Sequence, residues 1–271
     1  MKKTALITGA TMGIGYELSL LFAEDSYDLI LIARDELTLR KMRSDFLLVY
    51  EIDIHIIAID LSRSTAAREI FDTIRTLNLE VDVLINNAGI GDYGYFSDQT
   101  LTAINKVMKV NIIAPVELTR LFVTGMIERG NGKILNISSL AAFVPGPKMS
   151  VYYASKTFLL SFSEALACEL NGTGVTISVL CPGPTKTGFQ AAVGSENSIL
   201  SRFNLLSSPD AVARQAYKDF FAEKKIITPG LINNSIRYIS GILSNKQLAK
   251  IVFKLQKLNR PEVGIKLNAH K

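Results

Sequence analysis

Short apolar runs alternate with longer amphipathic segments over the first two-thirds of the chain, and this alternation limits the fold more than any other feature. Runs such as residues 29–33 are apolar at consecutive positions, as in strands that are buried on both faces. Segments such as residues 14–23 have apolar side chains at helical spacing. We therefore expect an α/β fold, a Rossmann-type doubly wound parallel sheet of about seven strands with helices on both faces and a C-terminal helical extension.

The same periodicity places the individual elements. The expected strands cover residues 3–8, 29–33, 54–59, 81–85, 133–137, 175–180 and 226–228. The expected helices cover residues 14–23, 37–49, 66–77, 99–128 and 151–170, and Pro115 is expected to interrupt the fourth of them. Ligand sites of such a sheet lie at the carboxyl ends of the strands.

Charge is distributed unevenly along the 271 residues, whose net charge is +5. Residues 1–223 contain 20 Lys and Arg against 24 Asp and Glu, a net of −4, whereas residues 224–271 contain 10 basic residues against Glu262 alone, a net of +9. The main body is mildly acidic, so we expect no nucleic-acid partner. We expect one domain over residues 1–230 and a basic helical extension over residues 231–271.

The extension has apolar residues at helical spacing, with lysines mostly on the other face. The favoured interpretation is a helical pair packed on the body with a solvated lysine face. The alternative is a basic amphipathic surface for an anionic membrane or an acidic carrier such as acyl carrier protein. The apolar positions are Ile236, Ile239, Leu243, Leu248, Ile251, Val252 and Leu255, and the lysines are Lys246, Lys250, Lys254 and Lys257.

Cysteine and histidine are too few for several kinds of site. Cys168 and Cys181 make no disulfide framework, which fits a reducing, cytoplasmic compartment. His55 and His270 are far apart, so we expect no metal site and no Ser-His-Asp triad. No apolar stretch of about 18 residues stands out, so we expect no membrane-spanning helix.

A glycine-rich loop connects the first expected strand to the first expected helix. It reads Thr-Gly-Ala-Thr-Met-Gly-Ile-Gly over residues 8–15. Glycines allow a sharp turn and a close approach to a pyrophosphate, and the start of a helix stabilises phosphate charge. A plain strand–helix turn is the alternative, but the position after the first strand favours a dinucleotide site.

A tyrosine and a lysine on one expected helix form a second motif. Tyr152 and Lys156 are four residues apart and so share a helix face. A nearby ammonium favours the phenolate, which makes the pair a tunable acid/base for a carbonyl oxygen. Tyr153 is a rival for this role, but its partner at the same spacing is Thr157. An ordinary amphipathic helix is the alternative interpretation.

Five motifs in this order resemble the short-chain dehydrogenase/reductase family, over about residues 3–230. They are the glycine loop, Asn-Asn-Ala-Gly at 86–89, Ser139 placed 13 residues before Tyr152, the Tyr-x-x-x-Lys pair, and Cys-Pro-Gly-Pro-Thr-Lys-Thr at 181–187. The resemblance implies a carbonyl reductase or alcohol dehydrogenase with the catalytic residues Asn111, Ser139, Tyr152 and Lys156. It also implies a cofactor site made by Gly9, Thr11, Gly13, Ile14, Gly15, Arg34, Asp60, Leu61, Asn87, Ala88, Gly89, Tyr152, Lys156, Pro182, Gly183, Thr185 and Thr187.

The end of the second expected strand bears on which cofactor binds. An acidic residue there would accept hydrogen bonds from the adenosine ribose and repel a 2′-phosphate, but the chain has Ala33 followed by Arg34. An arginine fork suits a phosphate. We therefore expect NADP(H) in preference to NAD(H). The acidic residue Asp35 beside Arg34 argues against NADP(H). So does Met12, since many NADP-dependent relatives have a basic residue in the glycine loop.

The resemblance also suggests a substrate cleft and partners. Residues 189–206, with Gln190, Phe203, Leu205 and Leu206, occupy the place of a substrate lid, and the aromatic segment 91–96 would form another wall. These features suggest a medium-sized, partly apolar carbonyl compound or alcohol as substrate. A homodimer or homotetramer through the helices 99–128 and 151–170 is expected by resemblance only. A non-catalytic dinucleotide sensor or scaffold is the alternative function, and a sugar-nucleotide epimerase is disfavoured by the glycine spacing.

Overall fold

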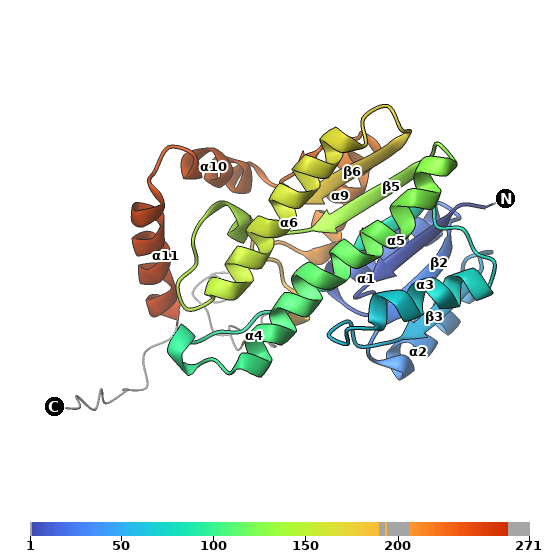
Figure 1. Cartoon of the computed structure of the whole chain (residues 1–271), viewed down its shortest axis with the longest axis horizontal. Helices are drawn as coiled ribbons and strands as arrows, with labels where there is room; N and C mark the ends of the chain where they lie inside the picture. Colours follow the sequence, from blue (N-terminus) through green and yellow to red (C-terminus); the bar gives the residue numbers. More distant parts are fainter. Residues whose placement is uncertain (1, 190–192, 194–205, 260–271) are drawn as a thin grey trace.

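Seven parallel strands form the central sheet of the computed structural model, which describes residues 2–189, 193 and 206–259 (Figure 1). Their order across the sheet is β3-β2-β1-β4-β5-β6-β7, so the connections turn back between β1 and β4. The doubly wound Rossmann-type fold is confirmed. The strands are β1 (Thr4–Thr8), β2 (Asp28–Ala33), β3 (Ile54–Ala58), β4 (Val83–Asn86), β5 (Gly132–Ile137), β6 (Val175–Leu180) and β7 (Ile226–Ile227).

Helices cover both faces of the sheet because successive strand residues point to opposite sides. Ala5 and Ile7 of β1 pack into one apolar cluster with α1 (Gly13–Glu24), α2 (Glu36–Leu47) and α9 (Pro209–Phe221). Leu6 between them packs into the other cluster, with α3 (Ala66–Thr76) and α5 (Ala114–Glu128). Figure 1 views the sheet from the side of α3, α5 and α6 (Ser150–Glu169).

The long helical stretch of residues 101–128 is continuous and has an irregular turn instead of a sharp break. It consists of α4 (Leu101–Met108), a π-helical turn (Lys109–Ile113) and α5, with Pro115 in the first turn of α5. A proline has no N–H to donate, and a π turn absorbs that loss without ending the helix. By length and composition this stretch could cross a membrane, and half of its most apolar window is buried within the fold.

Helix α9 is absent from the expected elements. Ser208 caps its N-terminus by accepting a hydrogen bond from the N–H of Ala211, and Pro209 occupies the first turn. Both are ordinary start signals for a helix. The helix packs beside α1, where the rings of Phe22 and Tyr217 meet edge to face at 4.9 Å. The apolar face of α9 thus completes the cluster that covers β1.

Two further helices extend from the last strand, α10 (Leu231–Ser240) and α11 (Asn245–Asn259). They lie at the end of the molecule away from α2 and α3 (Figure 1). Some of the apolar residues expected on these helices are buried and others are exposed. The domain boundary at residue 230 stays a prediction. Leu248 is buried, Leu243 and Val252 are half-buried, and Ile236, Ile239, Ile251 and Leu255 are exposed.

Candidate active site

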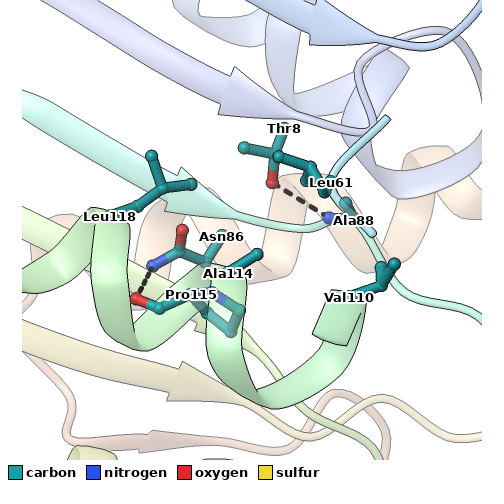
Figure 2. Close-up of a pocket in the computed structure, with 8 residues that line it drawn as sticks. All are labelled: Thr8, Leu61, Asn86, Ala88, Val110, Ala114, Pro115 and Leu118. Atoms are coloured by element: carbon teal, nitrogen blue, oxygen red, sulfur yellow. Dashed lines mark hydrogen bonds between the residues drawn. The ribbon is translucent and has the colours of Figure 1, made fainter. Parts of the chain in front are cut away.

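The glycine loop after β1 is tied to the end of β4. Thr8 Oγ1 accepts hydrogen bonds of 3.0 Å from the N–H groups of both Asn87 and Ala88, and Figure 2 shows the second of them. The Asn87 amide in turn donates to the carbonyl oxygens of Thr8 and Gly9. Gly9 has a φ of +65°, which an L side chain rarely adopts. The motifs at residues 8–15 and 86–89 therefore form one unit at the turning point of the sheet.

The N-terminus of α1 is open to an anion. Its first turn contains no acidic residue, and the N-cap residue Met12 makes no side-chain capping bond. The N-termini of α2 and α9, in contrast, are capped by Asp35 and Ser208. Uncapped N–H groups and the helix dipole together favour a phosphate, so this corner fits the pyrophosphate of a dinucleotide.

Three charged residues surround the place expected for the adenosine end. Arg34 is exposed directly after β2. Asp35 uses its carboxylate to accept hydrogen bonds from the N–H and hydroxyl of Thr38, which lowers its pKa. Asp60 accepts a bond of 2.9 Å from the N–H of Ser62. Burial is the largest single effect on its pKa and raises it, but the hydrogen bonds from Ser62 and the positive charges of Lys106 and Arg34 together lower the pKa. The Asp35 carboxylate is thus committed to capping α2, whereas the Arg34 side chain extends into solvent.

Ser139 and Tyr152 meet at the carboxyl end of β5. Their side chains share a hydrogen bond that favours the phenolate, but burial is the larger effect and raises the pKa of Tyr152 well above its usual range. The phenol is therefore neutral near pH 7. Ser139 Oγ also accepts a 3.1 Å bond from the N–H of Ala141, which fixes the hydroxyl at the start of a short helical turn.

Lys156 lies next to this pair in the interior. Its Nζ atom is 5.8 Å from the centroid of the Tyr152 ring and donates a 2.8 Å hydrogen bond to the carbonyl of Ile137. Burial lowers the pKa of Lys156 to about 8. Gly89 faces the ammonium, since a Cβ atom there would be 3.2 Å from Nζ. The Asn-Asn-Ala-Gly motif therefore reaches the lysine as well as the glycine loop.

Asn111, in the π turn between α4 and α5, forms hydrogen bonds in the same part of the site. Its Oδ1 accepts a 2.9 Å bond from the N–H of Ile90, and its Nδ2 donates to the Ile90 carbonyl and to Ser155 Oγ. Asn111 is buried, and both its side-chain oxygen and its side-chain nitrogen are hydrogen-bonded. It therefore does not face solvent, as an isolated asparagine on a helix often does.

The segment after β6 closes the site against the glycine loop. The carbonyl of Pro182 accepts a hydrogen bond from the N–H of Leu140, next to Ser139. A Cβ atom at Gly13 would be 2.8 Å from the methyl group of Thr187. The structure thus brings the distant motifs together as the pattern predicts. The remaining predicted residues lie around them, with Thr11 half-buried and Ile14, Leu61 and Thr185 buried.

Aromatic residues line the side of the site away from the glycine loop. The Tyr152 and Phe189 rings are 5.1 Å apart, and a Cβ atom at Gly91 would be 2.8 Å from the Phe189 ring. The segment 91–96 therefore flanks Tyr152. Of the expected lid, Gln190, Phe203 and Leu205 lie outside the described residues, and Leu206 is half-buried.

Helix α11 reaches this aromatic wall, which sequence reasoning does not anticipate. Tyr153 accepts a 3.3 Å hydrogen bond from the amide of Gln256. The ammonium of the buried residue Lys148 lies 4.7 Å from the Tyr95 ring centroid and 5.8 Å from that of Phe253 in α11. No local pattern marks these contacts because they join segments about 100 residues apart. Tyr153 is thus occupied with α11, while Tyr152 faces Ser139.

Comparison with known proteins identifies the family of the chain. The family model for short chain dehydrogenases matches residues 3–198, and the chain belongs to the short-chain dehydrogenase/reductase family. It is 34% identical over 236 residues to the ketoacyl reductase HetN of Nostoc, covering 86% of this chain and 79% of that protein. It also matches EphD of Mycobacterium tuberculosis at 32% identity over 189 residues, 69% of this chain but 32% of the length of that longer protein.

Solved structures show the same fold with bound dinucleotides. A short-chain dehydrogenase from Sphingobium yanoikuyae in complex with NADPH is 26% identical, with a TM-score of 0.79 over 89% of this chain and 96% of that one. A family member from Burkholderia phymatum in complex with NAD is 22% identical, with a TM-score of 0.77 over 97% and 98%. The chain is therefore an oxidoreductase of this family, whose members use either dinucleotide.

Proposed function

We propose that this protein is an NADPH-dependent carbonyl reductase that interconverts a ketone and a secondary alcohol. The observation that carries the proposal is the cluster of the half-buried Ser139 and Tyr152 with the buried Lys156, in a fold whose first helix has an uncapped N-terminus. A hydride donor, a proton donor and an oxyanion partner are what carbonyl reduction requires.

The chain's own residues supply everything except the hydride, which a bound nicotinamide dinucleotide supplies or accepts. Tyr152 is protonated near pH 7 and gives its proton to the developing alkoxide. Ser139 donates a hydrogen bond to the substrate carbonyl and holds it near Tyr152. The Lys156 ammonium stabilises the phenolate that remains and binds the nicotinamide ribose. Asn111 supports a water molecule that passes protons toward Lys156.

The preference for NADP(H) rests on the adenosine end of the site. Ala33 has no carboxylate to repel a 2′-phosphate, and Asp35 is engaged with Thr38. The exposed Arg34 guanidinium remains to bind that phosphate. The Sphingobium structure with NADPH supports this choice. The Burkholderia structure contains NAD, so NAD(H) is the alternative cofactor, and kinetics with NADPH and with NADH must distinguish the two.

The substrate we propose is a medium-sized, partly apolar carbonyl compound. The rings of Phe189 and Tyr153 lie beside Tyr152, and Gly91 at the start of the aromatic segment 91–96 lies beside Phe189. Aromatic walls favour apolar groups on both sides of a carbonyl. The ketoacyl reductase name of the Nostoc relative is compatible with such a substrate.

A variant at Tyr152 tests the reaction and the residue together. Tyr152→Phe is expected to reduce the turnover of carbonyl substrates by about 10²-fold or more while leaving NADPH binding intact. Tyr153→Phe is the matched control, since it removes the neighbouring hydroxyl and should retain most of the turnover. Cofactor oxidation over a carbonyl panel measures the first quantity and fluorescence titration the second. Full turnover by Tyr152→Phe, or dinucleotide binding without any turnover by the unaltered protein, would refute the proposal; the second result favours a sensor.

We propose in addition that the protein forms a homodimer or homotetramer through α4 and α6. A groove of about 460 Å³ between these helices is lined by Met108, Ile112 and Phe158 among others, and Met108 and Phe158 are exposed. Covering such an apolar surface stabilises an oligomer. Phe158→Glu should lower the mass measured by light scattering to that of a monomer. A monomeric unaltered protein would contradict this proposal and leave the catalytic one untouched.

A further inference from the structure

Exposed apolar side chains are concentrated on α10 and α11. Six of the nineteen large apolar side chains that are exposed in the described residues fall within residues 236–255. Surface apolar residues are normally scattered, so such a concentration indicates a contact surface. The six are Ile236, Tyr238, Ile239, Ile242, Ile251 and Leu255.

On α11 the exposed apolar side chains are not the ones that dock the helix on the body. On α11 the buried positions are Leu248 and Gln256, and the amide of Gln256 bonds to Tyr153 in α6. Ile251 and Leu255 lie one turn apart on an adjacent stripe and are 49% and 55% exposed. The docking of α11 on the body therefore leaves this stripe in contact with solvent.

The exposed apolar stripe of α11 is bordered by positive charge. Residues 231–259 contain five basic residues and no acidic one. Lys246, Lys250 and Lys254 are exposed and, at a spacing of four residues, form a stripe of their own beside Ile251 and Leu255. This arrangement contrasts with the main body, whose residues 1–223 have a net charge of −4.

We propose that α10 and α11 bind the surface of an anionic lipid bilayer, with the six apolar side chains in the interfacial region and the lysines at the headgroups. An interfacial helix combines shallow apolar insertion with lysine contacts to acidic lipid, and both parts are present here. A second copy of the chain fits less well, because a symmetric contact would face one set of lysines with another. A soluble acidic protein would pair the lysines but leave the apolar stripe uncovered.

The bilayer surface would lie next to the substrate side of the site. The buried face of α11 next to the exposed stripe carries Gln256, which reaches Tyr153, the neighbour of Tyr152. The inference does not depend on the catalytic proposal, because the exposed stripe and the lysines exist whether or not the protein turns over a carbonyl.

Vesicle flotation with the full chain tests the proposal. The protein should float with vesicles of phosphatidylcholine and phosphatidylglycerol, and binding should fall by about tenfold or more with phosphatidylcholine alone or in high salt. Ile251→Glu with Leu255→Glu should abolish flotation, and Lys250→Glu with Lys254→Glu should weaken it about tenfold or more. The matched control is Leu48→Glu with Val49→Glu, which changes exposed apolar residues near α2 at the other end of the molecule and should float normally.

Several outcomes would overturn the inference. One is the absence of binding to anionic vesicles at low salt, and another is equal loss of flotation in the control. Binding that depends on the lysines but not on Ile251 and Leu255 would indicate a purely electrostatic partner. A fall in solution mass on introducing Ile251→Glu with Leu255→Glu would indicate that a second copy covers this face. Circular dichroism of each variant confirms that it is folded.

Discussion

The side-chain amide of Gln256 donates a 3.3 Å hydrogen bond to the hydroxyl of Tyr153, joining α11 to the helix that carries Tyr152 and Lys156. The backbone carbonyl of Gln256 also accepts a bond from the hydroxyl of Tyr93. Gln256 is 8% exposed, and its Oε1 is buried without a hydrogen-bond partner. A C-terminal helix thus reaches both aromatic segments that flank Tyr152.

Removing the Gln256 amide should alter substrate binding more than the chemical step. Gln256→Leu deprives Tyr153 of its partner and releases α11 from the aromatic wall, so we expect KM for a carbonyl substrate to rise several-fold while kcat changes little. Steady-state kinetics at saturating NADPH measure both. Lys250→Met, an exposed change on the same helix, should leave both unaltered. Equal losses in kcat and kcat/KM for Gln256→Leu would instead place Gln256 in the transition state.

The pH dependence of cofactor use should report Lys156. Its pKa is lowered to about 8 by burial, so the ammonium is present below that pH and is lost as the pH rises through it. We expect kcat/KM for NADPH to be level below about pH 8 and to fall above it, because this parameter reports the free protein. Lys156→Arg retains its positive charge at higher pH, so the kcat/KM for NADPH of any remaining activity should stay level above pH 8. A fall above pH 8 in that variant would assign the titration to another group.

Arg34 should determine the preference between the two dinucleotides. Arg34→Leu removes a charged hydrogen-bond donor from the proposed 2′-phosphate, so kcat/KM for NADPH should fall by about 10- to 100-fold while that for NADH stays nearly constant. Arg43→Leu, an exposed change on α2, is the control for a general loss of positive charge. A parallel fall with both cofactors, or no change with either, would contradict the assignment.

A buried polar network joins β4, β5 and α6 beneath the site and should dominate local stability. The Asn86 amide donates to Asn136 Oδ1 at 2.8 Å, and the Asn136 amide donates to Ser163 Oγ at 2.9 Å. Asn136→Ala leaves buried groups without partners, so we expect the free energy of unfolding to fall by about 2–4 kcal/mol. Urea denaturation measures this loss, and the exposed change Asn171→Ala should cost much less. A cost below about 1 kcal/mol would show that the network rearranges.

Local sequence patterns were sufficient for the order of the strands and for a prediction of the site's chemistry. A strand buried on both faces must be apolar at consecutive positions, so β1, β2 and β4 can be recognised from a few residues each. The glycine loop and the Tyr152–Lys156 pair are likewise local, because their geometry depends on a turn and on one helical repeat. Helix α9 also has a local start signal in Ser208 and Pro209, which the periodicity of its apolar positions alone did not reveal.

Other features depend on contacts that no local pattern encodes. The pKa shifts of Tyr152 and Lys156 come from burial by elements far apart in the chain, and the bonds of Asn111 require the π turn to face Ile90. The sequence by itself determined the doubly wound sheet and the family, and it predicted the residues of the site. Only the tertiary structure decided that α11 meets Tyr153 and leaves Ile251 and Leu255 exposed, because helical periodicity defines an apolar face but not whether a partner surface covers it.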